Sequence, residues 1–173
     1  MSTGTIVFSH GKDSEPWGTK IVALAEVARD LGWRVESVDY RGIDSVEARL
    51  SALLAACAGF AAVGGSAAGP VLVGSSLGGF LSAAASIEVR ARGLFLMAPA
   101  FDLPGLPRTP VVERCPTVVV HGWGDDVVPV EKGLAFARAQ GALMHLVDDD
   151  HRLHASLPRM TGWLRDFLGG LGA

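Results

Sequence analysis

The sequence predicts a doubly wound α/β fold built on a mostly parallel sheet of six strands. Six short apolar runs of strand length alternate with longer segments in which apolar residues recur at helical spacing. Helical segments between strands indicate βαβ units, and right-handed crossovers place the helices on both faces of the sheet. Residue types suited to chemistry also follow several of these runs, where open parallel sheets bind ligands.

Size and composition favour one folded domain that spans residues 1–173. A chain of 173 residues is long enough to bury a core, and 49% apolar with 19% charged residues is typical of a globular protein. The net charge is −3, from 15 basic and 18 acidic residues, with no basic stripe. We therefore expect neither a nucleic-acid nor a membrane partner.

Targeting signals and cysteines point to the cytoplasm. The segment MSTGTIVFSHG lacks a basic region followed by a long apolar one, so we expect no signal peptide. No stretch approaches the roughly 18 apolar residues needed to span a bilayer. Cys57 and Cys115 stand in dissimilar contexts, which leaves a disulfide open but makes free thiols the simpler interpretation. The sequence indicates no particular oligomeric state.

The first half of the chain starts with a buried strand at 5–9. A helix is expected from Pro16, which suits a first turn, to Gly32, which suits a stop, and residues 33–40 form an alternating strand. Asp44 with Glu47 resembles a capping box that opens the next helix.

The second half continues the alternation after a loop of small residues at 65–70. Predicted strands cover 71–74, 93–99, 117–122 and 142–147, and predicted helices cover about 77–90, 130–140 and 152–168. The segment 100–116 holds four of the nine prolines, so we expect a surface excursion there.

A glycine-rich turn between the third strand and its helix is the strongest chemical signal. Residues 74–78 read GSSLG, which matches the G-x-S-x-G nucleophile elbow in its strand–turn–helix context. The turn is so sharp that side chains at the flanking positions would collide, and it presents Ser76 as a nucleophile. An ordinary glycine-rich turn that binds phosphate is the alternative, although neither dinucleotide-binding nor P-loop glycine spacing is present.

A serine nucleophile needs a base, and the chain has five histidines. His145 lies inside a strand, while His10 and His121 precede glycines and are expected to shape turns. We prefer His151, because it ends the loop after the last strand, whereas His154 is expected on the closing helix. Metal binding by this histidine-rich, acidic segment is the rival hypothesis; its candidate ligands are Asp148, Asp150, His151 and His154.

The base needs a carboxylate to orient it. Asp125 and Asp126 follow the fifth strand, with turn chemistry ahead of Pro129 as the alternative role for one of them. Asp102, after the fourth strand, is a further candidate. Serine, then aspartate, then histidine is the chain order expected with this elbow.

Four segments, in order, resemble those of the α/β-hydrolase superfamily. They are HG at 10–11, GSSLGG at 74–79, HGWGDDVVP at 121–129 and DDDHRL at 148–153, so the resemblance covers nearly the whole chain. The HGxxDxxVP form selects Asp125 over Asp126. The chain is most similar to small, lidless esterases and thioesterases, including the group of dienelactone hydrolase, although that enzyme uses cysteine where this chain has Ser76. The two leading antiparallel strands and the cap domain of larger members are absent, which predicts a minimal fold.

The resemblance implies an oxyanion hole made by the backbone N–H groups of Leu77 and of Gly11 or Lys12. It also implies a small-molecule acyl ester or thioester as substrate and no cofactor or metal. Two other functions stay open: a binding module that keeps the fold with little turnover, and a peptidase or amidase that uses the same three side chains. Loops must supply the rim of the site, and our candidates for its apolar walls are Trp17, Phe101, Leu103 and Trp123.

Overall fold

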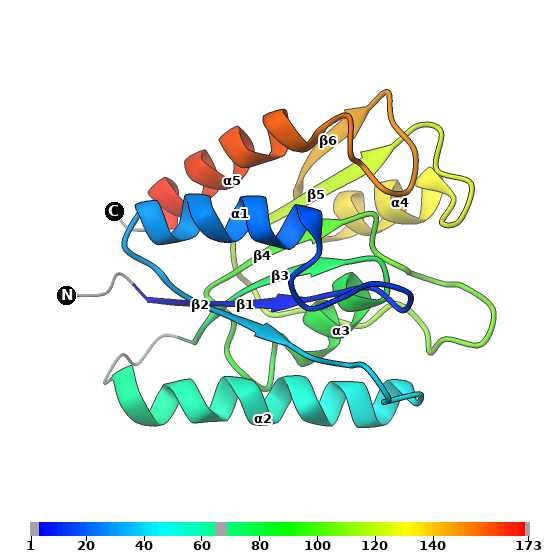
Figure 1. Ribbon diagram of the computed structural model, residues 1–173. Coiled ribbons are helices and arrows are strands. Elements are labelled where there is room, and N and C mark those ends of the chain that lie inside the picture. Colours follow the sequence, from blue (N-terminus) through cyan, green and yellow to red (C-terminus); the bar gives the residue numbers. More distant parts are fainter. Residues whose placement is uncertain (1–3, 65–68, 172–173) are drawn as a thin grey trace.

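A six-stranded parallel sheet with helices on both faces forms the protein (Figure 1). The computed structural model describes residues 4–64 and 69–171, so part of the predicted loop at 65–70 lies outside the described residues. Strand order is β2-β1-β3-β4-β5-β6, and every neighbouring pair is parallel. The elements are β1 (Thr5–Ser9), α1 (Thr19–Asp30), β2 (Arg34–Val38), α2 (Val46–Gly64), β3 (Val71–Ser75), α3 (Leu77–Ala85), β4 (Gly93–Met97), β5 (Thr117–Gly122), α4 (Val130–Gln140), β6 (Leu143–Val147) and α5 (Leu157–Leu171).

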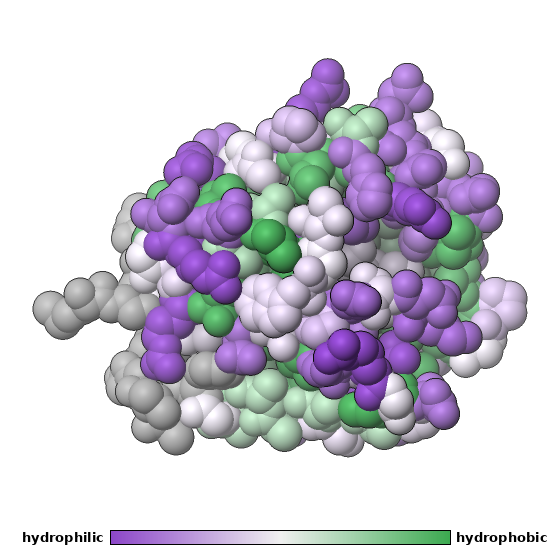
Figure 2. Space-filling view, viewed as in Figure 1, coloured by the Kyte–Doolittle hydropathy of each residue, from purple (hydrophilic) through white to green (hydrophobic). Residues whose placement is uncertain are grey.

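The sheet separates two apolar cores. Helices α1 and α5 cover one face, and α2, α3 and α4 cover the other. Strands β3, β4 and β5 are buried along their whole length because both of their faces meet helices. Hydrophilic side chains cover much of the face seen in Figure 2, with apolar ones in small groups between them. No helix among residues 4–64 and 69–171 is long and apolar enough to cross a membrane.

The predicted fold class is confirmed, and the strands lie where the apolar runs predict them. Three helix starts, those of α1, α2 and α5, were predicted wrongly. Helix α1 begins at Thr19 rather than near Pro16, because the carbonyl of Pro16 accepts a hydrogen bond from Ser37 on β2 and keeps the segment in a loop. Gly32 does end this helix, with φ at +80°.

Helix α2 is capped by a serine and not by the predicted Asp44–Glu47 box. The hydroxyl of Ser45 accepts a hydrogen bond from the backbone N–H of Ala48 at 3.1 Å, the geometry of an N-cap at the third helical position. The helix therefore begins at Val46, one residue later than an Asp44 cap would give.

Helices α3 and α5 are also shorter than the sequence predicts. Helix α3 ends at Ala85, where the Ser86 hydroxyl bonds back to the Ala83 carbonyl. Helix α5 begins only at Leu157, because side-chain hydrogen bonds within residues 149–156 hold a loop. His154 therefore lies in this loop and not on the helix, which corrects the prediction.

Gly78 brings α3 close to the carboxyl end of β1. A Cβ at this position would lie 1.9 Å from the carbonyl oxygen of Ser9, so the backbone would have to move. By contrast, a Cβ at Gly162 on α5 would meet no atom within 4 Å.

The two glycines predict opposite responses to the same substitution. Gly78→Ala lowers the free energy of unfolding by about 1–3 kcal/mol or more, because overpacking forces the backbone to shift. Gly162→Ala, the matched control, raises it by about 0.5–1 kcal/mol, since alanine favours the helix. Urea denaturation of both variants measures this. Equal stability of the two variants contradicts the close packing of α3 on β1.

Candidate active site

Ser76 lies in the sharp turn between β3 and α3. Its φ of 54° and ψ of −119° place it in a backbone region that non-glycine residues rarely adopt. The surrounding chain holds this conformation: the N–H of Ser76 donates to the Met97 carbonyl at 2.9 Å, and its carbonyl accepts from the N–H of Ala100 at 3.0 Å. The turn also requires glycine at position 74, because a Cβ at Gly74 would lie 2.3 Å from the carbonyl oxygen of Gly78.

The structure brings Ser76, His151 and Asp125 into one chain of hydrogen bonds. His151 Nε2 lies 3.0 Å from Ser76 Oγ, and His151 Nδ1 lies 2.8 Å from Asp125 Oδ2. These side chains come from the β3–α3 turn, the β6–α5 loop and the β5–α4 loop. Because a carboxylate can only accept, Nδ1 carries the proton, and Nε2 of the neutral ring presents a lone pair to the serine hydroxyl.

Asp125 is held by three hydrogen-bond donors and lies against the ring of His121. Its Oδ1 accepts from the N–H groups of Val127 at 2.9 Å and Val128 at 2.8 Å. Its Oδ2 faces His151 Nδ1 at 2.8 Å and His121 Nε2 at 3.1 Å. The Asp125 side chain has no exposed surface, so these bonds replace water and fix the carboxylate against His151.

His121 is a residue of the site that the sequence did not reveal as such. It was expected to shape a turn, but its fully buried ring places Nε2 3.0 Å from the Val128 carbonyl as well as beside Asp125. The Val128 carbonyl can only accept, so the ring carries its proton on Nε2. Nδ1 has no described hydrogen-bond partner, and a Cβ at Gly133 of α4 would lie 2.3 Å from it. A neutral Nε2–H tautomer is the one that fits this position.

The loop that carries His151 is built by its own aspartates. Asp149 accepts from the N–H of Ser156 at 2.7 Å, and Asp150 accepts from the N–H of Arg152 at 2.8 Å. The Asp149 carbonyl also accepts from the N–H of Gly124 at 3.0 Å, which ties this loop to the one that carries Asp125. These contacts give the acidic residues a structural role. Within the described ranges, no group of three His, Cys, Asp or Glu side chains could hold a metal ion.

The loop after β1 lies beside Ser76. A Cβ at Gly11 would lie 3.4 Å from Ser76 Cβ, and Leu77 is the first residue of α3, where the N–H has no partner within a helix. His10 anchors the loop: its Nε2 accepts from the N–H of Tyr40 at 3.0 Å, and its Nδ1 donates to the Gly11 carbonyl at 2.8 Å. Burial lowers the pKa of His10, so the ring stays neutral in this role.

The other candidate acids and bases lie away from this chain of hydrogen bonds. Asp126 and Asp102 are exposed, and the Asp102 carboxylate accepts a hydrogen bond from the N–H of Thr109. His145 stacks on Trp163 with ring centroids 3.9 Å apart, and His154 is exposed. Neither cysteine is in a disulfide.

The four predicted apolar wall residues divide into different environments. Trp17 and Trp123 are 43% and 59% exposed, and their role as walls of the site stays a prediction. Leu103 is half-buried. Phe101 is fully buried and packs on Phe136 with centroids 4.4 Å apart, so it is a core residue and not a wall of the site. An apolar residue after a strand does not by itself distinguish the two roles.

Removing the His121 donor tests its contribution. His121→Leu leaves the Val128 carbonyl without its buried donor, so we expect the free energy of unfolding to fall by about 1–3 kcal/mol. His145→Leu, on the neighbouring strand β6, is the control and is expected to change it less. Urea denaturation compares the two, and a larger loss at position 145 contradicts the assigned hydrogen bonds.

Comparisons with known proteins were made by sequence and by structure. No protein-family model matches the chain, and no curated protein matches it. A crystal structure from Xanthomonas campestris pv. campestris, assigned to the alpha/beta hydrolase superfamily, is 35% identical. It matches with a TM-score of 0.89 over 98% of this chain and 99% of that chain.

More distant structures share the fold. Est1E from Butyrivibrio proteoclasticus is 19% identical, with a TM-score of 0.80 over 98% of this chain and 88% of that chain. A second Xanthomonas campestris protein, described as an α/β serine hydrolase without a lid, is also 19% identical. Its TM-score is 0.78 over 96% of this chain and 81% of that chain.

Proposed function

This chain belongs to the α/β-hydrolase superfamily, and we propose that it is a serine hydrolase that cleaves carboxylic ester or thioester bonds through an acyl-enzyme intermediate. The observation that carries the proposal is the unbroken chain of hydrogen bonds from Ser76 through His151 to the buried Asp125. A strained serine beside a correctly protonated histidine is the arrangement that makes a hydroxyl nucleophilic.

In the first step, Ser76 Oγ attacks the acyl carbonyl carbon while His151 Nε2 takes the hydroxyl proton. The resulting imidazolium lies against Asp125, whose negative charge stabilises it. The backbone N–H groups of Val127 and Val128 hold the Asp125 carboxylate in place. His121 acts through Asp125 in this scheme, as a positioning residue whose ring packs beside the carboxylate and bonds to the Val128 carbonyl.

The developing oxyanion is stabilised by backbone N–H groups. Leu77 at the start of α3 supplies one, and Gly11 or Lys12 supplies the other from the loop beside Ser76. Each such donor is worth about 10²–10³ in rate where it has been measured. The hydrogen bonds of His10 to Tyr40 and Gly11 keep this loop in place before substrate binds.

The first half of the reaction ends when the bond from the carbonyl carbon to the leaving group breaks, and His151 gives its proton to the departing alcohol or thiol, so that the acyl-enzyme remains. The second half is its hydrolysis. Water then takes the place of the serine: His151 removes its proton, the hydroxide attacks the acyl-enzyme carbonyl, and the proton returns to Ser76 as the acid leaves. These steps need no group beyond the side chains and N–H groups named. Ester and thioester substrates are favoured over amides because their leaving groups depart more easily.

An activated serine is expected to react with a fluorophosphonate. Wild type and Ser75→Ala should gain the mass of one adduct, and Ser76→Ala should gain none, because Oγ of Ser76 is the proposed nucleophile. Intact-mass spectrometry of folded protein measures this, with circular dichroism to establish the fold. An unlabelled wild type would favour a binding module instead, and an adduct that survives Ser76→Ala would place the reactive group at another residue.

Two substitutions separate the role of the buried Asp125 carboxylate from that of the neighbouring Asp126. Asp125→Asn should reduce kcat on a simple ester by about 10⁴-fold, since an amide at this position favours the wrong tautomer of His151. Asp126→Asn removes the same charge one residue further along and should change kcat little, because that side chain is exposed. Steady-state kinetics of both variants measures the difference. Comparable losses from the two substitutions would refute the assignment.

A further inference from the structure

Lys20 is a charged side chain next to the proposed nucleophile that the mechanism does not use. It is the second residue of α1, and its Nζ donates to Ser75 Oγ at 3.0 Å. Ser75 directly precedes Ser76 and ends β3. The ammonium group of Lys20 is therefore held on the side chain of the residue that precedes the proposed nucleophile.

This ammonium has unused hydrogen-bonding capacity. Nζ carries three N–H bonds, and the bond to Ser75 uses one of them. No carboxylate of residues 4–64 or 69–171 forms an ion pair with it.

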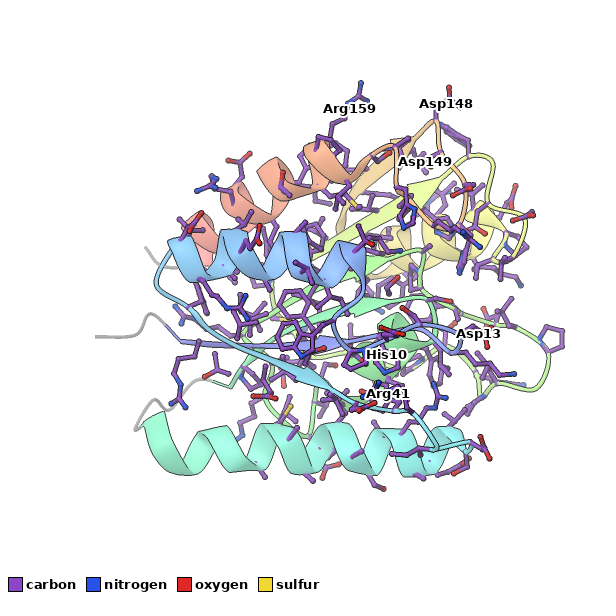
Figure 3. All side chains as sticks on the ribbon, viewed as in Figure 1. His10, Asp13, Arg41, Asp148, Asp149 and Arg159 are labelled. Carbon is purple, nitrogen blue, oxygen red and sulfur yellow. The ribbon has the colours of Figure 1, made fainter. Side chains whose placement is uncertain are left out.

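Three aspartates act electrostatically on Lys20, but their oxygens accept hydrogen bonds from other groups. Asp125 on the β5–α4 loop, and Asp149 and Asp150 on the β6–α5 loop, attract the ammonium and raise its pKa. Asp149 is labelled at the upper right of Figure 3, in the loop between β6 and α5. Their oxygens accept hydrogen bonds from their own loops and, at Asp125, from His151.

Burial has the largest effect on the pKa of Lys20. Desolvation lowers its pKa to about 8 against the opposing attraction of Asp149, Asp150 and Asp125. At neutral pH the group therefore keeps its positive charge while it has lost part of its hydration. A cation in this state gains more from a directly bound anion than a solvated surface lysine does.

We propose that Lys20 binds an anionic group of the substrate, so that the site prefers esters or thioesters that carry a carboxylate near the bond to be cleaved. This inference rests on the proposed function and narrows its substrate class. A carboxylate of the substrate would accept the free N–H bonds of Nζ while the ester carbonyl lies over Ser76. The carboxylate can belong to the acyl group or to the leaving group, and both sources present the same chemistry.

The test compares charged esters with neutral esters of the same shape. Monomethyl succinate is paired with methyl 4-methylpentanoate, which places the charge on the acyl side. The ester 3-acetoxypropanoate is paired with 3-methylbutyl acetate, which places it on the leaving group. For each pair, pH-stat assays give the ratio of kcat/KM for the charged ester to kcat/KM for the neutral one.

Wild type should favour the charged ester of at least one pair, and Lys20→Met should lower that ratio by about tenfold to a hundredfold. Lys132→Met removes an equal charge on α4 and should leave the ratio unchanged, and Ser75→Ala should keep it because the ammonium remains.

The ratio should also fall in wild type as pH rises through the pKa of Lys20, since the charged form exists below that pKa. Protonation of His151 affects both esters of a pair and cancels.

The outcomes separate this inference from the function on which it rests. Hydrolysis of the neutral esters with no preference for either charged ester, or a ratio that survives Lys20→Met, overturns the role of Lys20 and leaves the hydrolase intact. Failure to hydrolyse any of the four esters, together with no fluorophosphonate adduct at Ser76, overturns both.

Discussion

The left-handed turn at Ser76 is the constraint on which the site depends. A serine at φ 54° is stable only where its neighbours leave room and its backbone is bonded on both sides. Gly74 and Gly78 leave that room, because a Cβ on either would overlap backbone atoms. Bonds to Met97 and Ala100 tie the turn to β4 and to the segment that follows it. The result is a hydroxyl that points away from the sheet toward His151.

The parallel sheet explains why residues far apart in sequence meet at this hydroxyl. All six strands run in one direction, so the loops after β1, β3, β5 and β6 share one edge of the sheet. Each loop is fixed by its own hydrogen bonds: His10 to Tyr40 after β1, Asp125 to two backbone N–H groups after β5, and Asp149 to Ser156 after β6. The site is therefore assembled by the fold before any substrate arrives, which is the arrangement that electrostatic catalysis requires.

The sequence predicted those parts of the fold and site that depend on short-range pattern. Apolar runs located the strands, and the GSSLG turn located Ser76 between a strand and a helix. Helix starts were less predictable, because they depend on tertiary contacts such as the bond from Ser37 to Pro16. His121 was expected only to shape a turn, because its place beside Asp125 and Val128 depends on how the loop after β5 folds. Lys20 was not singled out, because Ser75, its hydrogen-bond partner, lies 55 residues away in the sequence. Phe101 was misplaced because burial on Phe136 is a property of packing and not of local sequence.

The most direct test of this account is a crystal structure of the protein after reaction with a fluorophosphonate. The account predicts a phosphorus atom bonded to Ser76 Oγ, with one phosphonyl oxygen about 2.7–3.1 Å from the N–H of Leu77 and from that of Gly11 or Lys12. His151 should remain hydrogen-bonded to Asp125. A phosphonyl oxygen that points into solvent, or an adduct that displaces His151 from Asp125, would contradict a preformed site at the end of this sheet.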